Sequence, residues 1–319
     1  MARFVVRRLV GMVLVLFVIS VIVFLIFNVI PNSDPAQRIA GKNATPQLVA
    51  NITKEWGFDK SLPEQYLTMM KKIFSGELIS YNSRLNVDEQ IVKGIPATFS
   101  LCIGAAVLWM FFGILFGYLS AVKAGRFTDR ALTVLAVAGI STPVFFIAAV
   151  FLYLFTFKIE LFPASSYVPF TEDPVAWANH LILPWISLAI LTAGFYSRVL
   201  RSNMLDAMNE DYVRTARAKG LSERRVMSRH VMRNSLIPIV TLFGLDFAAV
   251  VGGGAILTES IFSLEGVGLY AAEAIGNLDL PPIMAVTLFG AFFVVVFNAL
   301  VDIAYAWLDP RIRLGTPAQ

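Results

Sequence analysis

Long runs of apolar residues, separated by polar loops, are the dominant pattern of this chain. The first run, Leu9–Ile30, contains no charged residue. Because a helix rises about 1.5 Å per residue, such a run is long enough to cross about 30 Å of hydrocarbon. Five further runs follow, at about 96–122, 131–157, 181–200, 236–257 and 283–307. The pattern predicts an all-α integral membrane protein with six transmembrane helices.

The first run follows three arginines, as the apolar core of a signal peptide would: Arg3, Arg7 and Arg8. It is too long for such a core, however, and no small-residue cleavage site follows it. We therefore interpret residues 1–30 as a retained membrane anchor span. The composition agrees with lipid around much of the chain, because 57% of the residues are apolar and only 15% are charged, whereas soluble domains carry about 25% charged residues.

Lysine and arginine are unevenly distributed between alternate loops. Residues 1–8, 123–130, 198–233 and those after 307 hold 17 of them, and the remaining loops hold nine of the 26 in total. Positive residues accumulate in cytoplasmic loops. The distribution therefore predicts that both termini are cytoplasmic, with 309–319 as a cytoplasmic tail. A nucleic-acid partner is not expected despite the net charge of +4, because the basic residues do not gather on one face.

The predicted extracytoplasmic region, residues 31–95, carries helix signals. One helix is expected from Thr45, as its N-terminal cap, to Gly57, and a second from Pro63 to Gly76. Proline suits the first turn of a helix, and glycine accepts the left-handed conformation that ends one. Two interpretations of this region stay open: a membrane-surface loop without a specific function, and a small docking or gating subdomain.

The predicted cytoplasmic loop 203–235 carries the pattern of two short amphipathic helices. Gly220 separates them, and Ser222 can cap the second. If the turn needs a positive φ, only glycine adopts it without strain. Leu205, Met208, Tyr212 and Ala216 recur at helical spacing in the first, and the second carries Val226, Met227, His230 and Val231. From the residues alone, the loop either docks a partner protein or lies on anionic lipid, which basic amphipathic helices also bind.

The run Asp-Tyr-Val-Arg-Thr-Ala-Arg-Ala-Lys-Gly-Leu at 211–221 resembles the cytoplasmic signature loop of binding-protein-dependent ABC permeases. In that family the loop forms coupling helices that sit in a cleft of the ATPase subunit. The generic signature has Glu-Ala-Ala where this chain has 214–216, and the closing pair here is Ile237-Pro238; both departures are typical of the peptide/nickel class. The resemblance assigns the ATPase-coupling role to Asp211, Tyr212, Arg214, Thr215, Ala216, Arg217, Lys219 and Gly220.

Shorter motifs extend the resemblance along nearly the whole chain, in the order found in the first of the two permease subunits. They include Asp34-Pro35-Ala36, Gly57-Phe58-Asp59, Glu259-Ser260-Ile261-Phe262 and Leu308-Asp309-Pro310-Arg311. The resemblance implies a type I ABC-importer permease fold, with a five-span permease core at 96–308 behind the anchor and the small helical outer region. It also implies a second related permease, two ATP-binding subunits and an extracytoplasmic substrate-binding protein as partners. The expected location is a bacterial or archaeal cytoplasmic membrane.

The sequence lacks the groups that would make this chain an enzyme. No G-x-x-x-x-G-K-[ST] phosphate-binding loop occurs, so we expect the chain to bind no cofactor, with ATP and magnesium on partner subunits. A metal site is not expected, because the chain holds one cysteine and two histidines: Cys102, His180 and His230. Neither paired carboxylates nor an activated nucleophile stand out at the membrane face.

Three polar residues in the predicted spans are candidates for the translocation pathway or for polar packing. Asp246 is costly in hydrocarbon and should face a cavity or a polar partner; we favour a structural hydrogen bond or a coupling role over a substrate contact. Asn298 and Asp302 lie four residues apart on one helix face. A secondary transporter, the main alternative besides a membrane enzyme, would need internal repeats and more intramembrane charge. The solute stays open among dipeptides, oligopeptides, nickel complexes, glutathione and oligosaccharides.

Two of the predicted spans contain residues that weaken a helix. The third holds Thr142-Pro143, and the fifth holds the triplet Gly252-Gly253-Gly254. We expect both spans to be softened at these positions.

Overall fold

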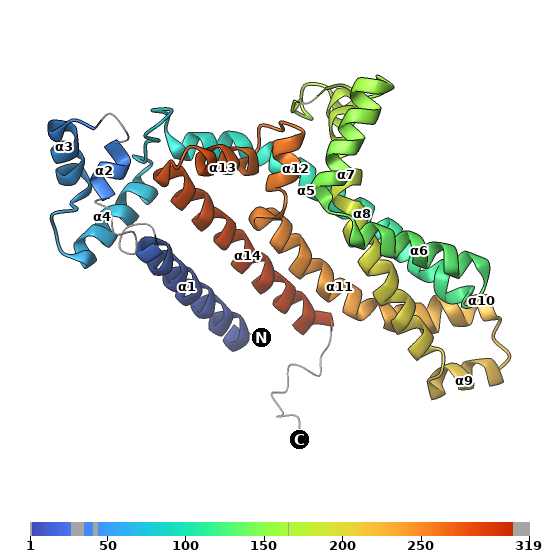
Figure 1. Ribbon diagram of the computed structural model, residues 1–319. Coiled ribbons are helices and arrows are strands. Elements are labelled where there is room, and N and C mark those ends of the chain that lie inside the picture. The colour runs from blue at the N-terminus through green and yellow to red at the C-terminus, as the bar shows by residue number, and fades with distance from the viewer. Residues whose placement is uncertain (1, 27–34, 41–43, 165, 309–319) are drawn as a thin grey trace. The chain divides into compact units, whose positions relative to one another are not determined.

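Helices make up most of the part of the chain that the structure describes. The computed structural model describes residues 2–26, 35–40, 44–164 and 166–308, and no β-strand occurs in these ranges (Figure 1). One isolated antiparallel bridge joins Ile79 and Asn86. The chain divides into two compact units, one of residues 1–98, 251–256 and 265–319 and one of residues 99–250 and 257–264. The predicted all-α class is confirmed.

In the first unit, α1 (Ala2–Phe24) and α14 (Leu280–Leu308) lie side by side (Figure 1). Part of each helix joins a common hydrophobic core with the residues between 36 and 91, and the buried members of this core include Phe24, Trp56, Met69 and Met284. Burying a side chain of this size stabilises a fold by about 1.5–3 kcal/mol. The segment after the first span is therefore packed against the span helices and is not a free linker.

The helices predicted for this segment are confirmed, together with their caps. After α2 (Pro35–Ala40), helix α3 (Pro46–Trp56) begins where the Thr45 hydroxyl accepts a hydrogen bond from the Leu48 amide, and it ends at Gly57, with a φ of 67°. Helix α4 (Leu62–Ser75) begins one residue earlier than expected and ends at Gly76, with a φ of 72°. Its Tyr66 hydroxyl lies 2.7 Å from the Ser20 hydroxyl of α1, which fixes α4 on the first span.

A buried carboxylate, Asp279, ties this segment to the start of α14. It accepts hydrogen bonds from the Ser80 hydroxyl at 2.5 Å and from the amides of Tyr81 and Asn82, each at 3.2 Å. Burial and the nearby Asp279 charge raise the pKa of Tyr270, on α13 (Val267–Gly276), to about 12. The carboxylate therefore gives the 80–82 turn a fixed position, and the Tyr270 hydroxyl stays neutral at physiological pH.

The second unit is built on the close pair formed by α6 (Phe127–Ser141) and α8 (Pro174–Ala207). A Cβ atom added to Gly194 would lie 2.8 Å from the Ala136 carbonyl oxygen, and one added to Gly139 would lie 3.0 Å from the Ile190 side chain. The two helices therefore approach more closely than larger residues would allow. The unit also contains most of α5 (Val87–Val122), α7 (Val144–Phe151) and α11 (Met232–Ala249).

Five of the six predicted spans are present as long apolar helices among the described residues. They comprise residues 6–24, 87–122, 174–207, 223–254 and 280–301. The third predicted span consists of two helical segments, 127–141 and 144–158, bent by 98° with respect to each other. Six spans result if this bent pair counts as one.

The bend has a local cause at Thr142-Pro143, as expected from the sequence. Thr142 is extended, with a φ of −97° and a ψ of 126°, because the proline ring disfavours a helical residue before it. Its hydroxyl donates to the Ala138 carbonyl at 2.8 Å, which satisfies one of the acceptors that the break exposes. The glycine triplet is also irregular: it lies in the π-helical segment η4 (Val250–Gly254), where Gly253 has a φ of 142°.

Two predicted helix starts were wrong by nine residues or more. The second span helix begins at Val87 and not at Pro96, and the helix of the fifth span begins at Glu223 and not at Leu236. Pro96 and Pro238 therefore lie inside helices. Proline removes only one backbone donor, and neighbouring helices can compensate that loss in a membrane protein. Val87 also belongs to the hydrophobic core of the first unit, so packing favours a helix there.

Candidate coupling hairpin

The hairpin predicted around Gly220 is present. Its first arm is α9 (Asp211–Ala218), and its second arm is α10 (Glu223–Arg225), which continues through the π-helical segment η3 (Val226–Val231) into α11. Gly220 has a φ of 77°. Its amide donates to the Arg217 carbonyl at 2.9 Å, and the Leu221 amide donates to the Ala216 carbonyl at 3.3 Å. This pair of bonds is the Schellman motif, which ends a helix with a left-handed glycine.

Gly220 is required for its backbone conformation and not for lack of space. A Cβ atom added there would meet nothing within 4 Å. The expectation of a positive φ is confirmed, and a substitution would strain the turn without causing a clash.

The apolar face of the first arm differs from the predicted one. Val213 and Ala216 are buried, whereas Tyr212 is 38% exposed. The predicted spacing ran through Leu205 and Met208, but α8 ends at Ala207 and α9 starts anew at Asp211. The break shifts the helical phase, so the pattern before it does not continue after it. The second arm buries Val226, Met227 and Val231, as expected, and packs against α9.

Four charged residues of the hairpin form two ion pairs with one another. Arg217 Nε lies 2.6 Å from Glu223 Oε1, which joins the two arms across the turn, and Arg214 lies 3.5 Å from Asp211. All four side chains are at least 40% exposed. Thr215 and Lys219 are exposed as well. Of the eight residues predicted to couple to an ATPase, Ala216 alone faces the inside of the hairpin, and the other seven are open to a partner.

Arg217→Glu is expected to have a small effect, because an exposed ion pair is worth about 0–1 kcal/mol. The thermal unfolding temperature should fall by a few degrees at most. The control is the exchanged pair Arg217→Glu with Glu223→Arg, which should restore the local attraction. A fall of more than about ten degrees that this control does not reverse would contradict the local role.

The polar residues predicted inside the spans have separate surroundings. In the second unit the Tyr196 hydroxyl of α8 donates to Asp246 Oδ2 of α11 at 2.7 Å, the structural hydrogen bond that the sequence interpretation favoured. Asn298 Oδ1 is buried and has no hydrogen-bond partner among the described atoms. Asp302 lies on α14, but its side chain is outside the described part of the chain, as is the tail 309–319. Asn298 and Asp302 belong to the first unit, and Asp246 belongs to the second.

A second polar cluster was missed from the sequence. Arg201 on α8 forms a two-bonded ion pair with Asp129 on α6 in the second unit. An arginine close to the end of an apolar run is expected at a cytoplasmic membrane surface in any case, and more than 70 residues separate the two positions, so spacing cannot identify the partner.

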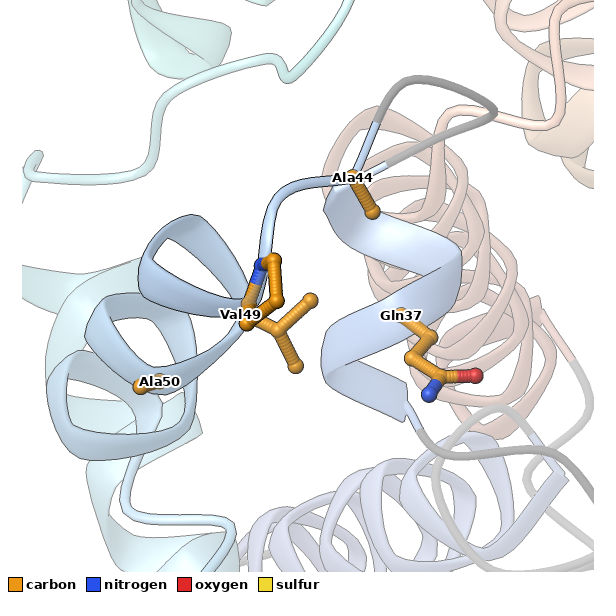
Figure 2. A pocket seen from close by; sticks show the side chains of 5 residues that line it. Gln37, Ala44, Val49 and Ala50 are labelled. Carbon is orange, nitrogen blue, oxygen red and sulfur yellow. The ribbon is translucent and has the colours of Figure 1, made fainter.

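Neither a metal centre nor a charged pocket emerges from the described residues. No group of three or more His, Cys, Asp or Glu side chains in that part of the chain can hold a metal ion. One open pocket lies between α2 and α3 and is lined by Gln37, Ala44, Pro46, Val49 and Ala50 (Figure 2). None of these five described lining residues is ionisable.

The span helices place the chain in the class of multi-pass membrane proteins. Large apolar side chains on them are widely exposed, among them Val13 at 69%, Phe111 at 58% and Phe146 at 56%. Soluble proteins do not leave apolar surface of this extent uncovered. Lipid or other membrane subunits must cover it.

Comparison with known proteins gives the family. Residues 113–314 match the family described as binding-protein-dependent transport system inner membrane component, and residues 1–102 match the N-terminal family of such membrane components. The probable peptide ABC transporter permease protein y4tP of Sinorhizobium fredii is 36% identical over 98% of this chain and 100% of its own length. The dipeptide transport system permease protein DppB of Bacillus subtilis is 34% identical over 98% and 99%.

The chain belongs to the family of inner membrane components of binding-protein-dependent transport systems. The expectation of a permease subunit, in place of an enzyme or a secondary transporter, is confirmed by these relatives. The predicted permease fold is confirmed with it.

Proposed function

We propose that this chain forms, together with a second related permease, the translocation path of an ATP-driven peptide importer. The supporting observation is its full-length similarity to proteins named as peptide and dipeptide permeases. A relative of similar identity is named as a glutathione permease, and another as a D,D-dipeptide permease. The class of solute we propose is therefore a short peptide or a peptide-like compound, delivered by an external binding protein.

ATP and magnesium bind, in this proposal, to two separate ATPase subunits. The chain has no phosphate-binding loop in its sequence, and its exposed hairpin is a compact protein-docking element. The residues that we propose for the ATPase contact are Asp211, Tyr212, Arg214, Thr215, Arg217, Lys219 and Gly220, with Ala216 packing the hairpin from inside. The outer region 31–95 would serve as a docking or gating subdomain.

The second arm of the hairpin offers a mechanical connection. Residues 223–249 form a helical stretch, through η3 and α11, from the Gly220 turn into the fifth span. A helix satisfies its own backbone hydrogen bonds and moves as a stiff element. ATP-driven closure of the ATPase subunits would displace the hairpin, and the fifth span would move with it. This movement would open the translocation path alternately to the two sides of the membrane.

The proposed location is the cytoplasmic membrane, with both termini inside. The domain organisation that goes with it is an anchor at 1–30, an outer region at 31–95, a permease core at 96–308 and a tail at 309–319.

Cysteine labelling tests this orientation. With Cys102 replaced by alanine, Ser222→Cys in the hairpin should react with a membrane-impermeant thiol reagent only after the membrane is opened, because position 222 would be cytoplasmic. Asn51→Cys on α3 is the control and should react in intact cells; both side chains are exposed. Labelling of the hairpin position in intact cells would reverse the proposed topology.

Uptake in cells tests the function. Deletion of this chain should abolish uptake of labelled di- and oligopeptides, and re-expression should restore it. Competition by unlabelled dipeptides, longer peptides and glutathione then identifies the solute. Undiminished uptake of all of these after deletion would contradict the peptide proposal.

A further inference from the structure

The Asp129 carboxylate is held by four hydrogen bonds in the second unit. Arg201 donates through Nε to Oδ1 at 2.7 Å and through its second terminal nitrogen to Oδ2 at 2.8 Å. The Ser120 hydroxyl also donates to Oδ1, and the Gly125 amide donates to Oδ2 at 2.8 Å. The carboxylate is only 5% exposed. Both oxygens are therefore fully used, and the site has no room for another ligand.

The four bonds join three successive parts of the chain to a fourth that is distant in sequence. Ser120 lies at the end of α5, Gly125 in the turn that follows, and Asp129 in the first turn of α6. Gly125 has a φ of 77°, which aims its amide at the carboxylate. Arg201 reaches this turn from α8, less than two helical turns before that helix ends at Ala207.

The position of Arg201 relates the ion pair to the hairpin. The first arm, α9, begins at Asp211, directly after the short turn that follows α8. Along the chain, a force applied to α9 passes into the end of α8. If that end moved without α6, the carboxylate would lose both arginine bonds and remain buried without a countercharge, which is strongly unfavourable. The ion pair therefore makes the end of α8 move together with the α5–α6 turn.

We propose that Asp129 and Arg201 are positioning residues that transmit the movement of the first hairpin arm into the paired helices α6 and α8. This inference rests on the proposed function, because it presumes that an ATPase moves the hairpin. It complements the continuous helix of the second arm: the second arm is joined to the fifth span by its backbone, and the first arm is joined to α6 by a side-chain ion pair. Without the pair, α8 would bend between Arg201 and its end at Ala207, and the movement of α9 would not reach α6.

The test uses the complete complex of both permeases, the ATPase subunits and the binding protein in proteoliposomes. The quantity measured is the amount of peptide transported per ATP hydrolysed. In Arg201→Met the hydrolysis should persist and the ratio should fall by about tenfold, because a buried charge loses its partner. Arg201→Lys, which keeps the charge but not the two-bonded geometry, should give an intermediate ratio. Arg198→Met, at an exposed arginine one turn earlier on α8, should keep the wild-type ratio.

Asp129→Asn is the second variant, and it should lower the ratio as Arg201→Met does. An unchanged ratio in the assembled Arg201→Met and Asp129→Asn complexes would overturn the inference, and so would failure of both to assemble, since the pair would then serve folding alone. A wild-type complex without ATP-dependent uptake would contradict the proposed function itself. A coupled wild type with unchanged variants would contradict only the role of the ion pair.

Discussion

Gly220→Val is expected to uncouple ATP hydrolysis from solute uptake while membrane insertion stays intact. Gly220 ends α9 in the left-handed conformation, with a φ of 77°, which a β-branched residue adopts only at a cost of about 1–2 kcal/mol. Because a Cβ meets nothing within 4 Å, the hairpin can relax by changing the angle between its arms. The second arm would then leave the turn in another direction and miss its site on the ATPase. Uptake and ATPase activity of the reconstituted complex measure the effect.

A control variant separates strain from contact. Gly220→Asn should be milder, because asparagine tolerates the left-handed region better than other residues. Normal coupling in Gly220→Val at normal expression would show that the turn is not a coupling element, and the lipid-surface interpretation of the loop would regain support.

Gly290→Val is expected to destabilise the first unit. A Cβ atom at position 290 on α14 would lie 2.4 Å from the Gly252 carbonyl oxygen, and one at Gly252 would lie 2.4 Å from the Val294 side chain. The first contact is with backbone, which cannot rotate away, so α14 and η4 would have to separate. Overpacking of this kind costs about 1–3 kcal/mol or more. We expect a lower unfolding temperature in detergent and less assembled complex.

The matched control for this second prediction is Gly11→Val on α1. A Cβ atom there meets nothing within 4 Å, so the variant should unfold at the wild-type temperature. Equal unfolding temperatures for Gly290→Val and Gly11→Val would contradict the close contact between α14 and η4.

Local features of the fold could be predicted from the sequence because short-range chemistry determines them. Thr45 and Gly57 bound α3 through a hydroxyl cap and a left-handed glycine, and Gly220 ends α9 in the same way. These effects involve residues within one or two helical turns. The number of apolar runs was equally accessible, since hydrophobic length alone defines a candidate span.

Features that depend on distant partners could not be predicted. Pro143 separates two helices bent by 98°, whereas Pro96, Pro184 and Pro238 lie inside continuous helices. Proline breaks the helix at one of these positions and lies within a helix at the others, because packing decides whether the lost backbone hydrogen bond is compensated. The partner of Arg201 is likewise set by the contact between α6 and α8 and not by spacing. The apolar face of α9 was misplaced because the end of α8 resets the helical phase.

The energy source of uptake tests the central claim most directly. Proteoliposomes with the purified complex would be loaded with ATP on the ATPase side and supplied with the external binding protein and labelled peptide, with and without this chain. We predict uptake that requires ATP, the binding protein and this chain together, and that persists when ion gradients are dissipated. Uptake by this chain alone, driven by an ion gradient in the absence of ATP, would contradict the account.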